Sequence, residues 1–156
     1  MLFQRINRTD AEKVFIICRN DGADAWAAGR PILWQADGTR DGIDAVQPSN
    51  ITTSGQWGGL IGIADAATAA AEYGLVQTYG LRTDVAVRQC GTATGGNGAI
   101  GDGLGGWVSG TNAFSATLAG NTGLAYAFGV VAMQTWASSS ATTTLPTAIK
   151  AFLRLM

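Results

Sequence analysis

The strongest constraint on the fold is a series of short apolar runs that end at glycine or at other turn residues. Within Trp57–Cys90, the runs Leu60–Ala64 and Tyr73–Tyr79 lie on either side of a connector of small residues, and the alternating run Val85–Cys90 follows. Each run has the length of one β-strand. The segment therefore predicts a β-hairpin followed by a third strand.

Similar runs occur along the rest of the chain, and most are bounded by residues that favour turns. The further predicted strands are Lys13–Arg19, Pro31–Gln35, Ile43–Val46, Trp107–Val108, Ala113–Leu118, Tyr126–Trp136 and Thr147–Leu155. In the last strand the alternate residues Ile149, Ala151, Leu153 and Leu155 are all apolar, so this face should meet the core. We predict an all-β fold, a single small β-barrel or sandwich-like domain with long Gly-rich loops.

The domain organisation follows from the length and from the first residues. A chain of 156 residues is long enough for one domain with its own core. Residues 1–12 are predicted to form an extended N-terminal arm, and residues 13–156 the β-domain. Met1–Asp10 can be a mobile arm, a strand lent to a neighbouring chain or a frayed terminus. On either of the first two interpretations, deleting Met1–Asp10 weakens assembly and leaves the fold intact.

The connector Asp65–Glu72 is rich in alanine and allows two interpretations. Its helix propensity is high enough for a helix of two turns. An isolated helix of this length is marginal, however, and Glu72 would lie at the unfavourable negative end of the helix dipole. We favour an irregular, exposed hairpin loop and keep the short helix as the alternative.

The charge pattern excludes one class of partner and points to another. The formal net charge is −1, and the ten basic residues form no stripe of the kind that binds nucleic acid. Between Gly103 and Ile149 there is no charged residue at all. This stretch is either a surface covered by another protein chain, which we favour, or an ordinary uncharged face of a sandwich.

Features of a membrane or secreted protein are absent from the sequence. Cys18 and Cys90 lie far apart, outside any Cys-x-x-Cys spacing, and each ends an apolar run, so buried free thiols are expected. The first residues contain no apolar signal region, and no apolar run is long enough to span a bilayer. We expect no membrane partner and a protein assembled in a reducing cytoplasm.

The residue types present do not favour an enzyme. The chain has no histidine, which excludes Ser–His and Cys–His nucleophiles and removes the commonest general base. Residues 96–101 match the pattern G-x-G-x-x-G, but the glycine-rich residues that follow cannot begin the helix that a dinucleotide requires. We therefore predict no cofactor and no catalytic residue.

Two weaker signals have a structural and a functional interpretation. Asp37, Asp41 and Asp44 lie close together in sequence, as in a loop that holds a cation, but they lack the spacing of an EF-hand. The tryptophans, among them Trp26, could stack on sugars, as in a carbohydrate- or receptor-binding module of a phage fibre or spike. Because they are spread over separate segments, core or interface positions are the better interpretation.

The order of several motifs resembles the capsid decoration (cement) proteins of tailed bacteriophages. The segments that carry this resemblance are Val14–Gly22, Ala28–Leu33, Gly59–Ala64, Glu72–Gly80, Ile100–Leu104, Ala127–Ala132 and Ile149–Leu155. The resemblance covers most of the chain from Val14 onward and consists of patterns without catalytic residues.

The resemblance implies a structural virion protein on the outside of the capsid. Its partners would be the major capsid protein and further copies of itself, typically as a homotrimer, and it would strengthen the shell without an active site. On this hypothesis the candidate capsid or oligomer contacts are Arg5, Arg8, Trp57, Asp65, Glu72, Trp107, Phe114 and Trp136.

Overall fold

The computed structural model describes residues 12–35, 40–47, 59–88, 101, 103–105, 114–116, 129–135 and 147–155, and these form β-strands and turns without a helix. The strands are β1 (Val14–Asn20), β2 (Pro31–Trp34), β3 (Asp44–Val46), β4 (Leu60–Ala64), β5 (Tyr73–Arg88), β6 (Leu104–Gly105), β7 (Phe114–Ala116), β8 (Val130–Ala132) and β9 (Thr147–Arg154). The predicted all-β class is confirmed.

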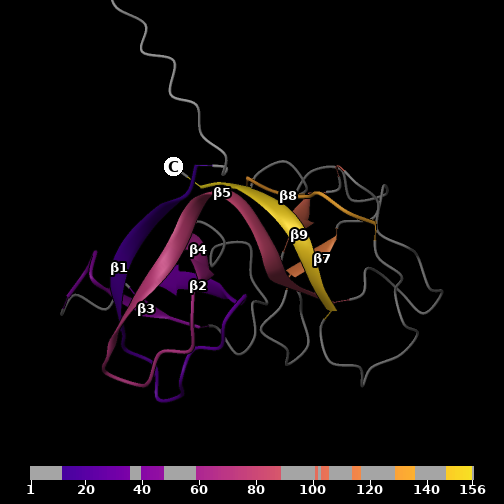
Figure 1. Cartoon of the computed structure of the whole chain (residues 1–156). Coiled ribbons are helices and arrows are strands. Elements are labelled where there is room, and N and C mark those ends of the chain that lie inside the picture. The colour runs from indigo at the N-terminus through magenta and orange to yellow at the C-terminus, as the bar shows by residue number, and fades with distance from the viewer. Residues whose placement is uncertain are drawn as a thin grey trace, which may run out of the picture.

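The long strand β5 is the centre of the architecture (Figure 1). Its first half closes a small mixed barrel, because the sheet order β1-β3-β2-β4-β5 returns to its start through an antiparallel β1–β5 ladder. Only the β1–β3 pairing in this ring is parallel. We call these five strands the N-terminal barrel.

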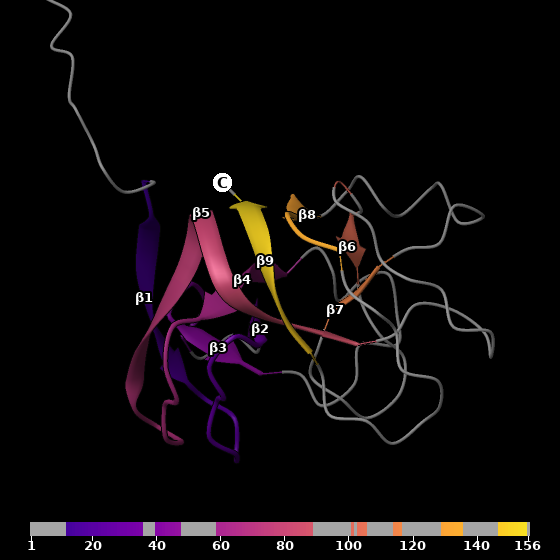
Figure 2. The same ribbon diagram turned by 45° about the vertical axis from the view of Figure 1, so that its right-hand side comes forward.

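The second half of β5 carries the remaining strands, which we call the C-terminal sheet. Strand β9 pairs with β5 from Tyr79 to Val87, and β8 pairs with the outer edge of β9. Strands β7 and β6 follow at the end of β5, and an isolated bridge between Gly103 and Val131 links them back to β8. Figure 2 shows this group beside the N-terminal barrel, with β5 reaching into both.

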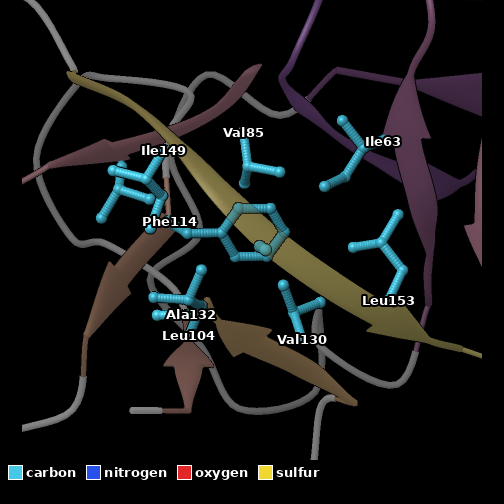
Figure 3. Close-up of a cluster of buried hydrophobic side chains, with 10 residues drawn as sticks. Ile63, Val85, Leu104, Phe114, Val130, Ala132, Ile149 and Leu153 are labelled. Atoms are coloured by element: carbon cyan, nitrogen blue, oxygen red, sulfur yellow. The ribbon is translucent and has the colours of Figure 1, made fainter. Parts of the chain in front are cut away.

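Each half of β5 has its own hydrophobic core. The core of the N-terminal barrel consists of Cys18, Trp26, Ile32, Ala45, Ile61, Ala64 and Val76. The core of the C-terminal sheet consists of Ile63, Val85, Val87, Leu104, Phe114, Val130, Ala132, Ile149, Ala151 and Leu153. In Figure 3 the ring of Phe114 lies among aliphatic side chains from several strands. Long-range pairing along β5 thus brings short strands together into two packed cores.

Strand β5 corrects the predicted hairpin followed by a third strand. Tyr73–Tyr79 and Val85–Cys90 were expected as separate strands, but residues 73–88 form one strand with a register shift between Arg82 and Val85. A β-bulge lets a strand bend without ending. Gly80, with a φ of 101°, lies in the same region, where its Cα approaches the main chain of Glu12 too closely for a side chain.

The other predicted strands agree with the structure to different extents. Leu60–Ala64 is confirmed at both ends, and Thr147–Leu155 is confirmed except for its last residue. Ile149, Ala151 and Leu153 are fully buried, as their alternation predicts. The predicted strand Tyr126–Trp136 is reduced to Val130–Ala132 among its described residues, and Trp107–Val108 lies outside them.

Candidate interaction surface

Large apolar side chains are exposed where β1 lies beside the start of β5. Ile17 is 67% exposed, Tyr73 64%, Leu75 45% and Phe15 36%. Ile17 lies opposite Leu75 in the ladder, and Arg19 lies opposite Tyr73, so these side chains share one face. We call Phe15, Ile17, Tyr73 and Leu75 the β1–β5 face. Contiguous exposed apolar surface of this kind marks an interaction site in many proteins.

A second, smaller exposed area lies on β8 and β9. Val131 faces Phe152 across the β8–β9 ladder, and Met133 is exposed beyond the end of β8. The ring of Phe152 makes an edge contact with Tyr79 at a centroid distance of 5.4 Å. Lys150 and Arg154 lie two residues before and two residues after Phe152 on β9, so all three side chains point to the same face of the sheet.

Asn20 positions the loops at the end of the β1–β5 face. Its buried side-chain amide donates to the carbonyl oxygens of Asp24 (2.9 Å), Thr68 (3.1 Å) and Ala69 (3.2 Å). Its side-chain oxygen accepts a hydrogen bond from the main chain of Gly22 (3.0 Å). One side chain therefore ties the turn after β1 to the connector between β4 and β5.

The connector Asp65–Glu72 is an irregular loop, as we favoured. Thr68 forms an isolated bridge with Trp26, with hydrogen bonds in both directions between their main chains. Ala71 has a φ of 64°, a conformation that a continuing α-helix does not contain. The loop is exposed at Asp65 and Glu72 and anchored at Thr68.

Arg82 joins the end of β4 to the bulge of β5. Its guanidinium binds both carboxylate oxygens of Asp84, at 2.6 and 2.9 Å, and the carboxylate of Asp65 at 3.0 Å. It also donates to the main-chain oxygen of Asp65 at 3.1 Å. Arg82 is only 5% exposed, so the arrangement gives a buried cation two carboxylate partners. This ion-pair network uses Asp65 structurally, a role that its prediction as a partner contact did not include.

The predicted acidic cluster near residue 40 is only partly described. Asp44 is buried and binds Arg19 at 3.2 Å, and Arg19 also binds Asp21 at 2.7 Å. These hydrogen bonds, the one to Asp21 foremost, raise the pKa of Arg19 above its usual value. Asp37 lies outside the described residues, and within the described ranges no group of three potential metal ligands occurs. The carboxylate of Asp44 is thus used in an ion pair.

The predicted contact residues do not form one site. Glu72 and Asp65 are exposed on the connector loop, as expected of contact residues. Phe114 is fully buried in the core of the C-terminal sheet, so its prediction as a surface contact was wrong. The predicted contacts that lie outside the described residues are Arg5, Arg8, Trp57, Trp107 and Trp136.

The burial of Trp26 agrees with the core interpretation that we favoured, whereas the uncharged stretch differs from expectation. Trp26, a candidate for sugar stacking, is 1% exposed and belongs to the core of the N-terminal barrel. The uncharged stretch was interpreted as a surface covered by another chain. Its described core residues Leu104, Phe114, Val130 and Ala132 are instead buried within this chain. In these parts the missing charges reflect an internal core.

Sequence reasoning missed the exposure of Ile17. Every residue from Val14 to Cys18 is apolar, so the pattern gave no sign of which face is outside. For β5 a signal existed, because the alternation of Tyr73–Tyr79 placed Tyr73 and Leu75 on one face. Combining that face with an apolar neighbouring strand would have located the β1–β5 face.

Cys18 is confirmed as a buried free thiol. Burial without a charged partner raises the pKa of the thiol to about 11, because the protein interior disfavours the thiolate. The side chain therefore acts as a small apolar core residue at neutral pH. Cys90 lies outside the described residues.

The membrane search and the comparisons with known proteins add no identification. Among the described residues there is no helix with the length and hydropathy needed to cross a bilayer. No protein-family model and no curated protein matches the chain.

Proposed function

We propose that this chain is a structural virion protein that binds the outside of a phage capsid as an oligomer and stabilises the shell. The resemblance of its motifs to capsid decoration proteins motivates the proposal, and the homotrimer and the major capsid protein as partner come from the same resemblance. The proposed location is the exterior of the virion.

The observation that carries the proposal is the β1–β5 face. Four large apolar side chains lie exposed on paired strands, and Ile17 and Tyr73 are more than half exposed. Leaving such a surface in water is unfavourable by roughly 25 cal/mol for each Å² of apolar area. A protein partner that covers it gains this free energy, which supports a binding function.

The rigid scaffold also favours binding across subunits of a shell. The face lies on hydrogen-bonded strands, and Asn20 fixes the adjacent loops, so little conformational entropy is lost when a partner covers it. A low-affinity contact made by each copy becomes strong when several linked copies bind at once. Oligomerisation and shell binding therefore reinforce each other.

Binding to heads tests the proposal. Purified protein is mixed with heads of the phage that encodes it, prepared without this chain, and the bound fraction is measured by sedimentation. We expect saturable binding, and a loss of at least about tenfold in affinity for Leu75→Asp, because a charge would be buried at the contact. The matched control is Met133→Asp, at an exposed position just beyond β8.

Two outcomes would contradict the proposal. One is an absence of binding to heads by the folded wild-type protein. The other is binding of the isolated protein to glycans with no binding to heads, which favours a carbohydrate-binding module instead.

A further inference from the structure

Among the described strands, none pairs with one edge of β1 along most of its length. Strand β1 pairs with β5 on one side from Val14 to Arg19. On the other side β3 pairs only with Arg19 and Asn20, so within the described part of the chain Val14–Cys18 has no strand there. Open edges of this kind readily pair with another strand.

The main-chain groups at this edge point away from the barrel. The amide of Arg19 donates to Ile43 on the β3 side (3.0 Å), and the amide of Asn20 donates to Glu72 on the β5 side (2.8 Å). Because the direction alternates along a strand, the N–H and C=O groups of Phe15 and Ile17 point to the open side. In the described ranges these groups have no partner on that side.

Two of the usual protections of an edge strand, a charged residue and a proline, are missing from this segment, although the β1–β5 ladder has a register shift between Val14 and Phe15. Natural edges carry lysine, proline or inward-pointing charges that prevent pairing. Here Val14–Cys18 contains no charged residue and no proline, and Phe15 and Ile17 are exposed. Main-chain and side-chain features thus favour the addition of a strand.

We propose that β1 pairs with β1 of a second copy in an antiparallel ladder centred on Ile16. In this register Phe15 of each copy lies opposite Ile17 of the other, and these are the two residues whose main-chain groups point outward. The pairing forms four hydrogen bonds between the copies and packs Phe15 against Ile17 twice. The contact is self-complementary, as a two-fold interface must be.

Charged residues lie at both ends of β1 in this arrangement. Lys13 precedes the open edge, is exposed and has no partner among the described side chains. The other end carries Asp21 and Asp44, which share the single cation Arg19 and so leave one excess negative charge. In this register Lys13 of each copy lies opposite Arg19 of the other, beside Asp21 and Asp44, so these two carboxylates have to offset the repulsion between the two cations.

This contact rests on the proposed function, because it describes how copies of the chain associate. It should form in solution without the capsid shell. A two-fold contact is also separate from the three-fold contact of the proposed trimer. Alone it forms a dimer, and together with a trimer contact it joins two trimers. Failure of shell binding and failure of this contact are therefore distinguishable.

The mass in solution tests the contact. Analytical ultracentrifugation of the full chain should give twice the chain mass of 16.0 kDa, or six times that mass if the three-fold contact forms as well. Ile17→Pro should raise the dissociation constant of the two-fold contact about thirtyfold, because two of four hydrogen bonds are lost, each corresponding to roughly a factor of five. Ile17→Lys, a side chain that an exposed position accepts, should also halve the mass. The control Met133→Lys should leave it unchanged.

A disulfide tests the register. The α-carbons of the two Ile16 residues would lie about 4.5 Å apart, within the range of a disulfide. In a Cys90→Ser background, Ile16→Cys should form a covalent dimer with copper–phenanthroline, and the control Ile43→Cys should not. A wild-type mass of one or three chains would overturn the proposal, as would an even mass that folded Ile17→Lys retains or a failure of Ile16→Cys to cross-link.

Discussion

The N-terminal barrel and the C-terminal sheet share β5 but bury different kinds of side chain. Among the described residues, the buried polar side chains are Asn20, Asp44, Thr68, Gln77, Thr78 and Arg82. All of them belong to the N-terminal barrel, to its β4–β5 connector or to the part of β5 next to it. The described core of the C-terminal sheet is entirely apolar.

The difference shows two ways to hold short strands together. In the barrel, buried hydrogen bonds fix the loops, and a lost partner leaves polar groups unsatisfied. In the C-terminal sheet, the close packing of aliphatic side chains around Phe114 provides the stability. Substitutions that preserve shape but not polarity should therefore damage the barrel, and substitutions that remove volume should damage the sheet.

The largest expected effect is that of Phe114→Ala. Removing a fully buried ring leaves a cavity in the core of the C-terminal sheet and should lower the free energy of unfolding by about 3–5 kcal/mol. Phe114→Leu, which keeps an apolar side chain, should cost less than half as much. Urea unfolding followed by tryptophan fluorescence measures both. If Phe114→Ala and Phe114→Leu lost the same free energy of unfolding, side-chain packing would not be what stabilises the C-terminal sheet.

Asn20→Leu is the corresponding test of the barrel. The substitution keeps the volume but removes the donor to the carbonyl oxygen of Asp24 and the acceptor of the Gly22 amide. It also removes one of the two donors to the carbonyl oxygens of Thr68 and Ala69, which keep their main-chain hydrogen bonds. We expect a loss of about 2–4 kcal/mol, together with faster amide hydrogen exchange in residues 66–72. Asp24→Ala is the control, because the bond from Asn20 goes to the main chain of Asp24. An unchanged free energy of unfolding for Asn20→Leu would contradict the stabilising role of these hydrogen bonds.

The stability of the fold should depend on pH through the buried thiol of Cys18. The pKa of Cys18 is raised from 9.0 to about 11 in the folded protein, so the unfolded chain loses this proton first. The contribution of Cys18 to stability is complete below pH 9 and is lost as the pH rises to 11, by roughly 2–3 kcal/mol. Urea unfolding across this range should show a smaller decrease for Cys18→Val. The same decrease in the free energy of unfolding for the wild type and for Cys18→Val would show that Cys18 does not cause the pH dependence.

The smallest effect is expected at the outer face of β9. Phe152→Ala removes the edge contact with Tyr79 from a half-buried position and should cost about 1 kcal/mol. Arg154→Ala should leave the unfolding midpoint unchanged, because its side chain is exposed and has no partner among the described residues. A cost of several kcal/mol for Phe152→Ala would mean that another chain covers this face.

The sequence predicted strands well where the apolar pattern was local. Leu60–Ala64 and the closing strand could be located because their residues alternate or are bounded by turns. The continuity of β5 could not be predicted, because the polar residues Arg82, Thr83 and Asp84 interrupt the apolar pattern between the two runs. They stay within the strand because Arg82 folds back onto the carboxylates of Asp84 and Asp65.

The residues of the candidate surface were harder to predict than the strands, because their burial or exposure depends on tertiary contacts. Trp26 is an isolated aromatic residue in a polar segment, and only its pairing with Thr68 in a distant loop explains its burial. Phe114 lies in an uncharged stretch whose burial depends on β5, β8 and β9. The open edge of β1 follows from how short β3 is, which no pattern within β1 reveals.

The shared strand β5 also orders the events of folding. All strands of the N-terminal barrel are complete once residues 14–79 have left the ribosome, whereas β9, which pairs with residues 79–87, begins only at Thr147. Domains form in this order during synthesis, and non-local pairing is slow. Until β9 arrives, the edge of β5 with which β9 pairs is open in the nascent protein. The charged residues of this edge, Arg82 and Asp84, are of the kind that keep such an edge from aggregating.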